Sequence, residues 1–472
     1  MPHPLAARTV VAPARETFRL VILERGGTEV LVVPDGDRLV LPSVEIPVWQ
    51  RLADSLTAAA KVEWGQEIIC LFTPAIAFIP EGCQRDDYQV AEHWRTTGEP
   101  RKPIRWETIL SLSEHSFADH SDYSAIAQSV AKCAAEMRTP TGPFARPGWF
   151  NDLRDWVESA IAPRGLHISE NFRQCNAGPS FSLVRFETDA ESVWFKAVGE
   201  PNQREFAITC LLAELFPSYL PPVLGVRPDW NAWLAREIAG TNLGEAQEVA
   251  LWEQVTTALA KLQIESIDHP ARVLGAGACD QTTNALSGRV GPFMELMARL
   301  MEQQTKVPPA IMTGKEILQL GNRIQGALEA LSSLGIPDTL GHSDLNPWNI
   351  TVSRQSCRFL DWAEAHVGNP FFSIQYLREH FRHTKGAGSG AEARIIESYC
   401  RPWRQVISSV VMTEALGLAP LLAVFAYAAG GNAWTNENTF REQATVGYLR
   451  SLTRRMHHES GRLTDRRTPC PL

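Results

Sequence analysis

The sequence predicts an α+β fold in which a smaller, β-rich α/β domain precedes a larger domain of strands followed by helices. Three observations support this prediction. Apolar, strand-like runs open the chain, and a second group of such runs follows a stretch rich in proline and glycine. From about residue 240 to about residue 458 the apolar spacing is mainly helical. Strands and helices that occupy separate parts of a chain are typical of α+β architecture.

The first predicted domain spans residues 1–140. Apolar runs at 18–24 and 29–33 flank Gly26 and Gly27, and two glycines between such runs indicate a hairpin turn. The remaining predicted elements are a strand at 38–42, a helix at 48–64, a strand at 67–72 and a closing helix at 125–137.

Residues 138–148 contain three prolines and two glycines, a composition that continues neither a helix nor a central strand. We expect an interdomain linker here. The second predicted domain, 149–238, opens with a helix whose apolar residues share one face. It continues with strands at 181–186 and 192–198, a helix at 203–215 and a strand at 230–237.

The third predicted domain, 239–472, is helical. Its apolar stretch at 406–429 is interrupted by Glu414, Gly417 and Pro420. We therefore expect two buried helices around a break at 417–420 rather than a membrane span. The polar tail from Glu459 onward is expected to fray.

Composition limits the function classes. A chain of 472 residues is expected to form two or three domains. A net charge of −8 argues against a general nucleic-acid-binding protein. The nine cysteines contain no Cys-x-x-Cys pair, so neither a disulfide framework nor a zinc site is expected, and a reducing cytoplasm fits best. The first 19 residues lack the layout of a signal peptide. We expect no nucleic-acid or membrane partner.

The most informative motif lies at 341–350, Gly-His-Ser-Asp-Leu-Asn-Pro-Trp-Asn-Ile, with Asp361 ending the next apolar run. Asp344 and Asn349 are five residues apart on a predicted loop. Phosphoryl transfer from a metal nucleotide needs one carboxylate to orient a hydroxyl, and an amide and a second carboxylate to hold Mg²⁺. This spacing favours a kinase-like phosphotransferase.

The motif and the element order resemble the aminoglycoside phosphotransferase and choline-kinase-like family over residues 149–455. The family loop, His-Gly-Asp-Leu-His-Pro-Gly-Asn, corresponds to 342–349, with Ser343, Asn346 and Trp348 as departures. The resemblance implies a bilobal, protein-kinase-like phosphotransferase fold. Its N-lobe would span 149–238 and its helical C-lobe 239–472.

The same resemblance assigns roles. Asp344 is the expected catalytic carboxylate, and Asn349 and Asp361 are the expected Mg²⁺ ligands. His342 is expected to support the loop rather than carry a proton. The family often continues Gly-Asp-Pro and then an aromatic residue and an Asp, but residues 368–373 are Gly-Asn-Pro-Phe-Phe-Ser. In the family these acids mostly support the catalytic loop, so their absence here is expected to affect the hydrogen bonds around the loop more than catalysis.

The nucleotide side carries a weaker pattern. Lys196 lies in an apolar strand and Glu205 in the following helix, as expected for a lysine that bridges phosphates and the acid that holds it. A strand-edge charge and an exposed helix residue are the alternatives. Ser180 and Ser182 fall where a phosphate loop belongs, although an ordinary turn fits equally well. Glu237 and Ile238 would form the hinge whose backbone meets adenine.

An acceptor pocket is expected between the catalytic loop and the late helices. Glu414, Asp465 and the segment from Trp434 to Asn438 are weak candidates for lining it. Glu364 and His366 could face substrate, but solvated loop positions are favoured for both.

The predicted function is ATP- and Mg²⁺-dependent transfer of a γ-phosphoryl group to the hydroxyl of a small molecule. The alternative is a nucleotide-binding pseudokinase that acts as a regulatory or interaction module. The first domain resembles a Nudix fold in its element order. Its helix offers only Asp54 and Glu63, nine residues apart, instead of a metal-binding acidic cluster. A non-catalytic role is expected.

Overall fold

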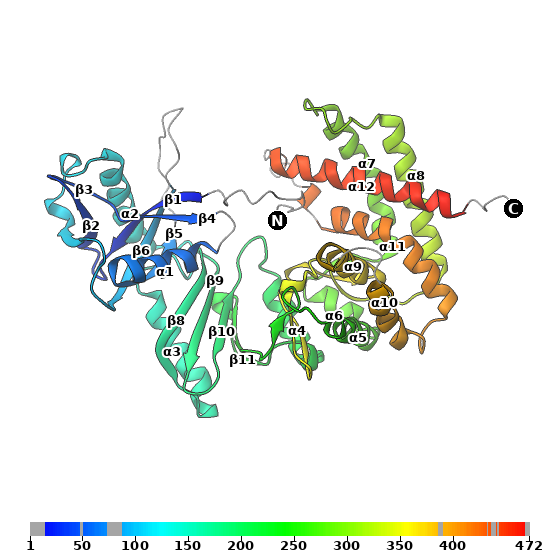
Figure 1. The fold of residues 1–472 in the computed structure, drawn as a ribbon, viewed down its shortest axis with the longest axis horizontal. Coiled ribbons are helices and arrows are strands. Elements are labelled where there is room, and N and C mark those ends of the chain that lie inside the picture. Colours follow the sequence, from blue (N-terminus) through cyan, green and yellow to red (C-terminus); the bar gives the residue numbers. More distant parts are fainter. Residues whose placement is uncertain are drawn as a thin grey trace. The chain divides into compact units, whose positions relative to one another are not determined.

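The computed structural model describes residues 15–47, 51–72, 87–385, 390–431, 433–435, 440 and 443–467. They form two compact units. The first runs to Gln203 and also contains Val223–Glu237, and the second contains Arg204–Pro222 and the chain from Ile238 onward. The first unit holds two large sheets and the second is mainly helical (Figure 1). The predicted α+β class with a β-rich N-terminal part is confirmed.

The first sheet has the strand order β3-β2-β1-β6-β5, with β4 beside β1 and β7 beside β2. Strands β1 and β6 are parallel and the other pairs are antiparallel. The elements are β1 (Arg15–Leu23), β2 (Glu29–Asp35), β3 (Arg38–Val40), β4 (Ser43–Pro47), α1 (Leu52–Trp64), β5 (Gln66–Phe72), β6 (Asp87–Thr96), β7 (Arg105–Thr108), η1 (Ile109–Ser111), η2 (Glu114–Ser116) and α2 (His120–Arg138).

The predicted N-terminal hairpin is confirmed, with Leu23 of β1 opposite Val30 of β2 and Gly27 at φ 68° in the turn. Gly65 directly follows α1, and its φ of 63° suits a residue without a Cβ atom. Helix α2 begins at Asp119, whose side chain accepts a hydrogen bond from the Ser121 amide.

The second sheet of this unit has the order β11-β12-β10-β9-β8, with every pair antiparallel. Its strands are β8 (Ile168–Ala177), β9 (Ser182–Thr188), β10 (Val193–Ala197), β11 (Val223–Arg227) and β12 (Ala232–Arg236). Helix α3 (Trp149–Ile161), followed by η3 (Ala162–Arg164), buries Trp149, Phe150, Leu153, Val157 and Ile161. One apolar core runs from the first sheet through α3 to the second sheet.

Apart from Arg138, the last residue of α2, the predicted linker at 138–148 has no helix or strand, as expected, but part of it is buried. Phe144 is 1% exposed, and its ring contacts Trp149, Phe195 and Trp230. Its amide donates to the Pro179 carbonyl at 3.0 Å. The proline-rich composition therefore predicted the irregular backbone correctly, whereas it gave no sign of the burial.

Strand β8 joins the two sheets. The Gln174 side chain accepts from the Cys70 amide at 2.8 Å and donates to the Cys70 carbonyl at 3.0 Å. It thus bonds β5 as a neighbouring strand would. Arg173 binds Asp54 of α1 through two bonds of 2.5 and 2.6 Å.

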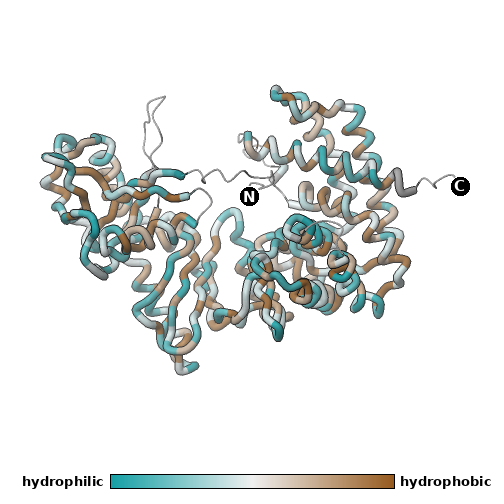
Figure 2. The backbone as a smooth tube through the Cα atoms, viewed as in Figure 1, coloured by the Kyte–Doolittle hydropathy of each residue, from teal (hydrophilic) through white to brown (hydrophobic). Residues whose placement is uncertain are grey.

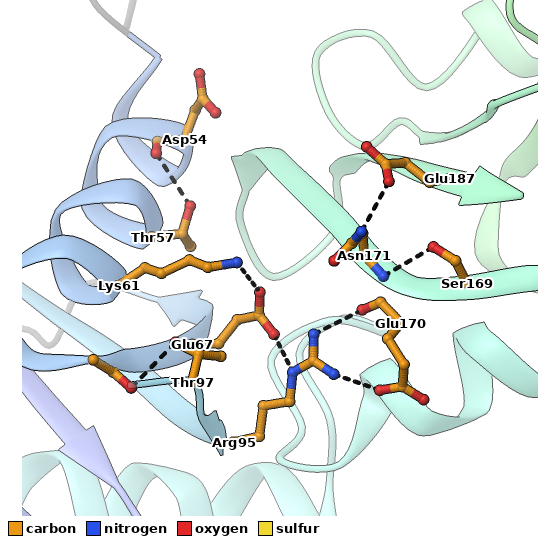
Figure 3. Close-up of polar contacts among 11 residues, drawn as sticks. Asp54, Thr57, Lys61, Glu67, Arg95, Thr97, Ser169, Glu170, Asn171 and Glu187 are labelled. Atoms are coloured by element: carbon orange, nitrogen blue, oxygen red, sulfur yellow. Dashed lines mark hydrogen bonds and ion pairs between the residues drawn. The ribbon is translucent and has the colours of Figure 1, made fainter. Parts of the chain in front are cut away.

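Arg95 extends this junction, because it bonds Glu67 at 2.6 Å and Glu170 at 2.5 Å (Figure 3). Both acids of the predicted Nudix-like helix form ion pairs. Asp54 pairs with Arg173, and Glu63 pairs with Lys102 at 3.0 Å. The Nudix-like interpretation and the predicted boundaries between the three domains remain predictions.

The second unit packs its helices around two small three-stranded sheets. Its helices are α4 (Glu205–Leu215), α5 (Val249–Glu265), α6 (Pro270–Gly275), α7 (Thr283–Glu302), α8 (Gly314–Ser333), α9 (Phe371–Lys385), α10 (Gly390–Trp403), α11 (Ser409–Gly430) and α12 (Gln443–Arg467). Its strands are β13 (Thr241–Asn242), β14 (Cys279–Gln281), β15 (Thr339–His342), β16 (Ile350–Val352), β17 (Cys357–Phe359) and β18 (Ala365–Gly368).

Short 3₁₀ segments connect these elements. They are η4 (Pro217–Tyr219), η6 (Pro347–Asn349), η7 (Trp362–Glu364) and η8 (Ala433–Thr435), with η5 (Pro228–Trp230) in the first unit. Apolar residues concentrate along the buried strands and helix faces, as the brown segments in Figure 2 show.

The expected break in the stretch at 406–429 is wrong. A single helix, α11, runs from Ser409 to Gly430 with Pro420 inside it. Proline removes one helical hydrogen bond, but the buried side chains on both sides of it, including Leu418, Leu421 and Phe425, stabilise the continuous helix. By length and composition α11 could cross a bilayer, yet half of its most apolar window is buried in this fold.

The expected fraying from Glu459 is also wrong, because α12 continues to Arg467. Ser460 is 1% exposed and Leu463 packs against the core. The polar composition of this segment concealed a narrow apolar face.

Candidate active site

The central loop of the site joins β15 to β16. Strand β15 pairs with β18, and β16 pairs with β17, so the segments on both sides of the loop are fixed by sheets. The loop closes through η6, where the Asn346 side chain accepts from the Trp348 amide at 2.9 Å. Trp348 itself is 58% exposed and packs on Gly244, where a Cβ atom would lie 2.9 Å from its ring.

His342 is a structural support of this loop. It is buried, its Nδ1 accepts from the Asp344 amide at 3.2 Å, and its Nε2 bonds the Leu360 carbonyl at 3.0 Å. The two contacts require the tautomer with the proton on Nε2. The ring thereby ties Asp344 to the segment that carries Asp361, which is the supporting role expected from the sequence.

The Asp344 carboxylate is held by three side chains. Its Oδ1 accepts from Asn346 Nδ2 at 3.2 Å and from the Tyr376 hydroxyl at 3.1 Å. Its Oδ2 accepts from Asn349 Nδ2 at 3.2 Å. Burial and the negative charge of Asp344 raise the pKa of Tyr376, so its hydroxyl remains a proton donor to the carboxylate.

The predicted metal ligands lie on two segments, because Asn349 ends the same loop and Asp361 follows β17. Asn349 turns its amide nitrogen toward Asp344, bonding the carbonyl at 3.0 Å as well as Oδ2, so Oδ1 is its ligating end. Asp361 is exposed and has a φ of 63°. A non-glycine residue in this conformation is often found at functional sites.

These donors fit Mg²⁺, which prefers oxygen ligands and is commonly bound by one or two carboxylates together with substrate phosphates. Among the residues that the structure describes, no group of three or more His, Cys, Asp or Glu side chains could hold a metal alone. Asp361 and Asn349 would therefore form an incomplete protein site that nucleotide oxygens complete.

The departures at 368–373 preserve the support of the loop. The Ser373 hydroxyl accepts from the His342 amide at 2.9 Å. The Asn369 side chain accepts from the Phe371 amide at 3.1 Å at the start of α9. Two neutral side chains thus provide hydrogen-bond acceptors where the family often has carboxylates.

The departure at Ser343 is matched by His366. Their side chains share a hydrogen bond of 3.0 Å, and Gln281 donates to the Ser343 hydroxyl at 3.3 Å. His366 is 1% exposed, and burial, followed by the nearby His342, lowers its pKa to about 3. The expectation of a solvated loop position for His366 is therefore wrong, since the ring is a neutral part of the core.

Glu364 is half-buried rather than solvated. Burial, followed by the negative charge of Asp344, raises its pKa to about 7, while Arg204 opposes this shift. Asp361 also contributes to the increase. Three carboxyl groups thus influence one another here, and such an excess of negative charge favours a bound cation.

A cavity of about 60 Å³ lies beside the loop between β15 and β16, with His342 and Ser343 in its wall. Tyr376, which bonds Asp344, forms part of its wall together with Tyr427 and Tyr448, and its polar side chains include Gln375, Glu379 and Arg455. Sequence reasoning missed these residues. Positions 375 and 379 lie four apart on α9 and therefore share one helix face.

Two of the weaker pocket candidates, Glu414 and Trp434, do not line this cavity. Glu414 is exposed on α11. Trp434 donates from its ring nitrogen to the Ala429 carbonyl at 2.9 Å and contacts Phe293, so it belongs to the core. The rest of that segment, residues 436–438, and the side chain of Asp465 lie outside the described residues.

On the nucleotide side, Lys196 lies in β10 of the first unit between Leu183 of β9 and Trp233 of β12. Its ammonium is 5.6 Å from the centre of the Trp233 ring. Ile238 opens the segment of the second unit that follows β12.

Two of the other candidates, Ser182 and Glu237, direct their polar side-chain atoms to neighbouring residues of the sheet. The buried Ser182 hydroxyl donates to the Asn176 carbonyl at 3.3 Å. Ser180 packs on Gly199, where a Cβ atom would lie 2.2 Å from its hydroxyl. Glu237 binds Arg185 through two bonds of 2.7 and 2.8 Å and accepts from the Trp194 ring at 2.9 Å. Only the backbone of Glu237 fits the predicted hinge role.

Glu205 is 1% exposed at the start of α4 in the second unit, so the alternative of an exposed helix residue is wrong. The preceding Arg204 donates to the Ala363 carbonyl at 2.9 Å. Helix α4 is thereby attached to η7, the segment directly after Asp361.

Residues 204–406 match the family model described as the phosphotransferase enzyme family. Among solved structures, the macrolide 2′-phosphotransferase of Brachybacterium faecium is similar over 64% of this chain and 98% of its own, with 16% identity and a TM-score of 0.42. The choline kinase of Cryptosporidium parvum Iowa II is similar over 67% and 97%, with 14% identity and a TM-score of 0.49.

A spectinomycin phosphotransferase, in complex with ADP and spectinomycin, is similar over 65% of this chain and 98% of its own, with 12% identity and a TM-score of 0.39. No curated protein sequence matches the chain. The family match over residues 204–406 confirms the predicted resemblance to a family of phosphotransferases.

Proposed function

We propose that this protein transfers the γ-phosphoryl group of ATP to a hydroxyl of a small molecule in a Mg²⁺-dependent reaction. The carrying observation is the arrangement around Asp344. Its carboxylate is held by Asn346, Asn349 and Tyr376, and the last of these also forms a wall of the cavity. An acceptor in the cavity would thus lie beside a fixed carboxylate.

The chain's residues divide the reaction between them. Asp344 accepts a hydrogen bond from the acceptor hydroxyl and takes its proton as the new oxygen–phosphorus bond forms and the bond to the β–γ bridging oxygen breaks. Lys196 would bind phosphate oxygens of the departing ADP. Asn349 and Asp361 would hold Mg²⁺, which supplies neutralisation of phosphate charge when bound.

One assay separates a phosphotransferase from the pseudokinase alternative. The full-length protein and Mg-ATP would be incubated with a broad panel of hydroxyl compounds, and transfer would be measured by phosphate incorporation into the acceptor. Asp344→Asn should lower kcat by roughly 100- to 10,000-fold, while melting temperature and ATP affinity remain close to those of the parent protein. Nucleotide binding without transfer to any compound would support the pseudokinase instead.

The location in the cytoplasm stays a prediction from the cysteine usage. The match to the family model supports the phosphotransferase class and leaves the acceptor open.

A further inference from the structure

Two residues that line the acceptor cavity, Gln375 and His366, each have a buried side-chain atom without a hydrogen-bond partner among the described residues. The Gln375 side chain is 2% exposed and lines the cavity. Its Nε2 donates to Glu379 Oε1 at 2.9 Å. Its Oε1 is fully buried and has no hydrogen-bond partner among the described residues. The orientation of the amide is fixed by this network, because a carboxylate can only accept.

A buried acceptor without a donor is unfavourable in an isolated protein. A ligand that offers an O–H or N–H group at this position would remove that cost. Gln375 therefore selects for a ligand with a hydrogen-bond donor.

The charges of the wall cancel. Glu379 and Arg455 are the charged residues among those that line the cavity, and they form an ion pair with each other. Glu379 is also the acceptor for Gln375. The two histidines of the wall, His342 and His366, are buried, and the pKa of His366 is lowered to about 3, so it carries no charge at neutral pH.

The size of the cavity limits the ligand. A volume of about 60 Å³ corresponds to roughly four to six water-sized positions, since one buried water needs on the order of 10–15 Å³ by the same measure. The enclosed part of the ligand is therefore compact, and the three tyrosines provide both flat apolar contact and hydroxyl groups.

From these observations we infer that the acceptor is a small uncharged polyol, one of whose hydroxyls donates to Gln375 Oε1 while another lies beside Asp344. This inference rests on the proposed function and adds the substrate class. Gln375 is then a specificity-determining residue, and the Glu379–Arg455 ion pair keeps the net charge of the cavity wall close to zero.

The test uses the full-length protein, Mg-ATP and three acceptors of similar size: glycerol, the ammonium-bearing serinol and the carboxylate-bearing glycerate, with erythritol as a longer polyol. We expect kcat/KM for the better of the two polyols to exceed that for either charged compound by about tenfold. Gln375→Met, which keeps the length of the side chain, should lower kcat/KM for that polyol by about tenfold, mainly through KM.

Charge variants give a signature that loss of structure would not produce. Arg455→Gln leaves the Glu379 charge unbalanced and should shift preference toward serinol by about tenfold. Glu379→Gln leaves Arg455 unbalanced and should shift preference toward glycerate. The matched control is Gln325→Met, because Gln325 donates to Glu329 with the same spacing on an exposed helix face. It should change none of these ratios.

The inference is overturned if the parent protein prefers serinol or glycerate. It is equally overturned if it accepts only compounds much larger than erythritol, or if folded Gln375→Met keeps the parent's polyol kcat/KM. If Gln375→Met does not fold, Gln375→Glu replaces it and should favour serinol, and an unchanged preference would contradict the inference. Failure of the proposed function looks different, since then no hydroxyl compound of the broad panel is phosphorylated.

Discussion

The catalytic loop of the second unit and the candidate nucleotide-binding residues of the first unit use their polar side chains differently. In the loop, side chains hold other functional side chains, as Asn349 and Tyr376 hold Asp344. Among the candidate nucleotide-binding residues, the Ser182 and Glu237 side chains instead bond neighbouring residues of their own sheet. The difference teaches that, under the proposed function, the first region would bind a nucleotide through its backbone and Lys196, whereas the second would act through its side chains.

The largest expected effect contrasts one carboxylate from each region. Asp361→Asn should lower kcat/KM by roughly 100- to 1,000-fold, because it would remove the charged ligand proposed for Mg²⁺. Glu237→Gln should leave kcat/KM within about threefold and cost about 1 kcal/mol of unfolding free energy, since its partly exposed pair with Arg185 is screened by solvent. Steady-state kinetics and urea denaturation measure the two. A catalytic loss in Glu237→Gln as large as in Asp361→Asn would break the comparison.

Lys196 is the side chain of the first unit whose replacement should lower activity. Lys196→Met should lower kcat/KM by about 10- to 100-fold, because a positive charge near the departing phosphates is lost. The apolar stem is retained, so the melting temperature should change little. Lys132→Met, on helix α2, is the control. If the two variants have the same kinetics, Lys196 has no part in the reaction.

A stability prediction concerns the strand that leads into the loop. In Gly341→Ala the new Cβ atom would lie 2.1 Å from His366 Nε2, across the β15–β18 pair. Overpacking of a buried site costs about 1–3 kcal/mol, which chemical denaturation can measure. Adding His366→Ala should recover part of the lost unfolding free energy, because it removes the ring that the new Cβ atom meets. If the losses of the two single substitutions simply add in the double variant, the predicted collision does not occur.

The pH dependence of stability provides a smaller effect. Burial and Asp344 raise the pKa of Glu364 to about 7 from an ordinary value of 4.5, so the folded protein holds this proton more tightly than the unfolded chain. The stabilisation is fully present below pH 4.5 and is lost as the pH rises through 7. In Glu364→Gln without added metal, the melting temperature should fall less between pH 4.5 and 7 than in the parent protein. Identical profiles would contradict the assignment.

The smallest effect separates the two serines of the predicted phosphate loop. Ser182→Ala should cost about 0.5–1 kcal/mol of stability and leave the KM for ATP unchanged, because its hydroxyl bonds the Asn176 carbonyl. Ser180→Ala should raise that KM if this hydroxyl contacts phosphate. A several-fold rise in KM for Ser182→Ala would show that its hydroxyl turns toward the nucleotide.

Sequence reasoning was most accurate where local chemistry is specific. The Asp344–Asn349 spacing and the Gly26–Gly27 hairpin depend on short-range patterns, and the structure contains both arrangements. The cavity wall could not be predicted in the same way. It combines α9, α11 and α12, so that Gln375, Tyr427 and Arg455 meet through tertiary packing that no short window contains. The continuous α11 was missed because burial outweighed the local effect of Pro420.

The Gln174 side chain has a practical consequence for anyone who divides this chain. The resemblance to phosphotransferases begins near residue 149, and the proline-rich stretch before it invites a truncation there. In such a fragment the buried Gln174 amide would lose both of its hydrogen bonds to the Cys70 backbone. Phe150 and Phe172 would lose their contacts with Trp94 and become exposed to water on that side. We expect poor solubility from it, and a kinase-like piece should be produced together with the N-terminal sheet.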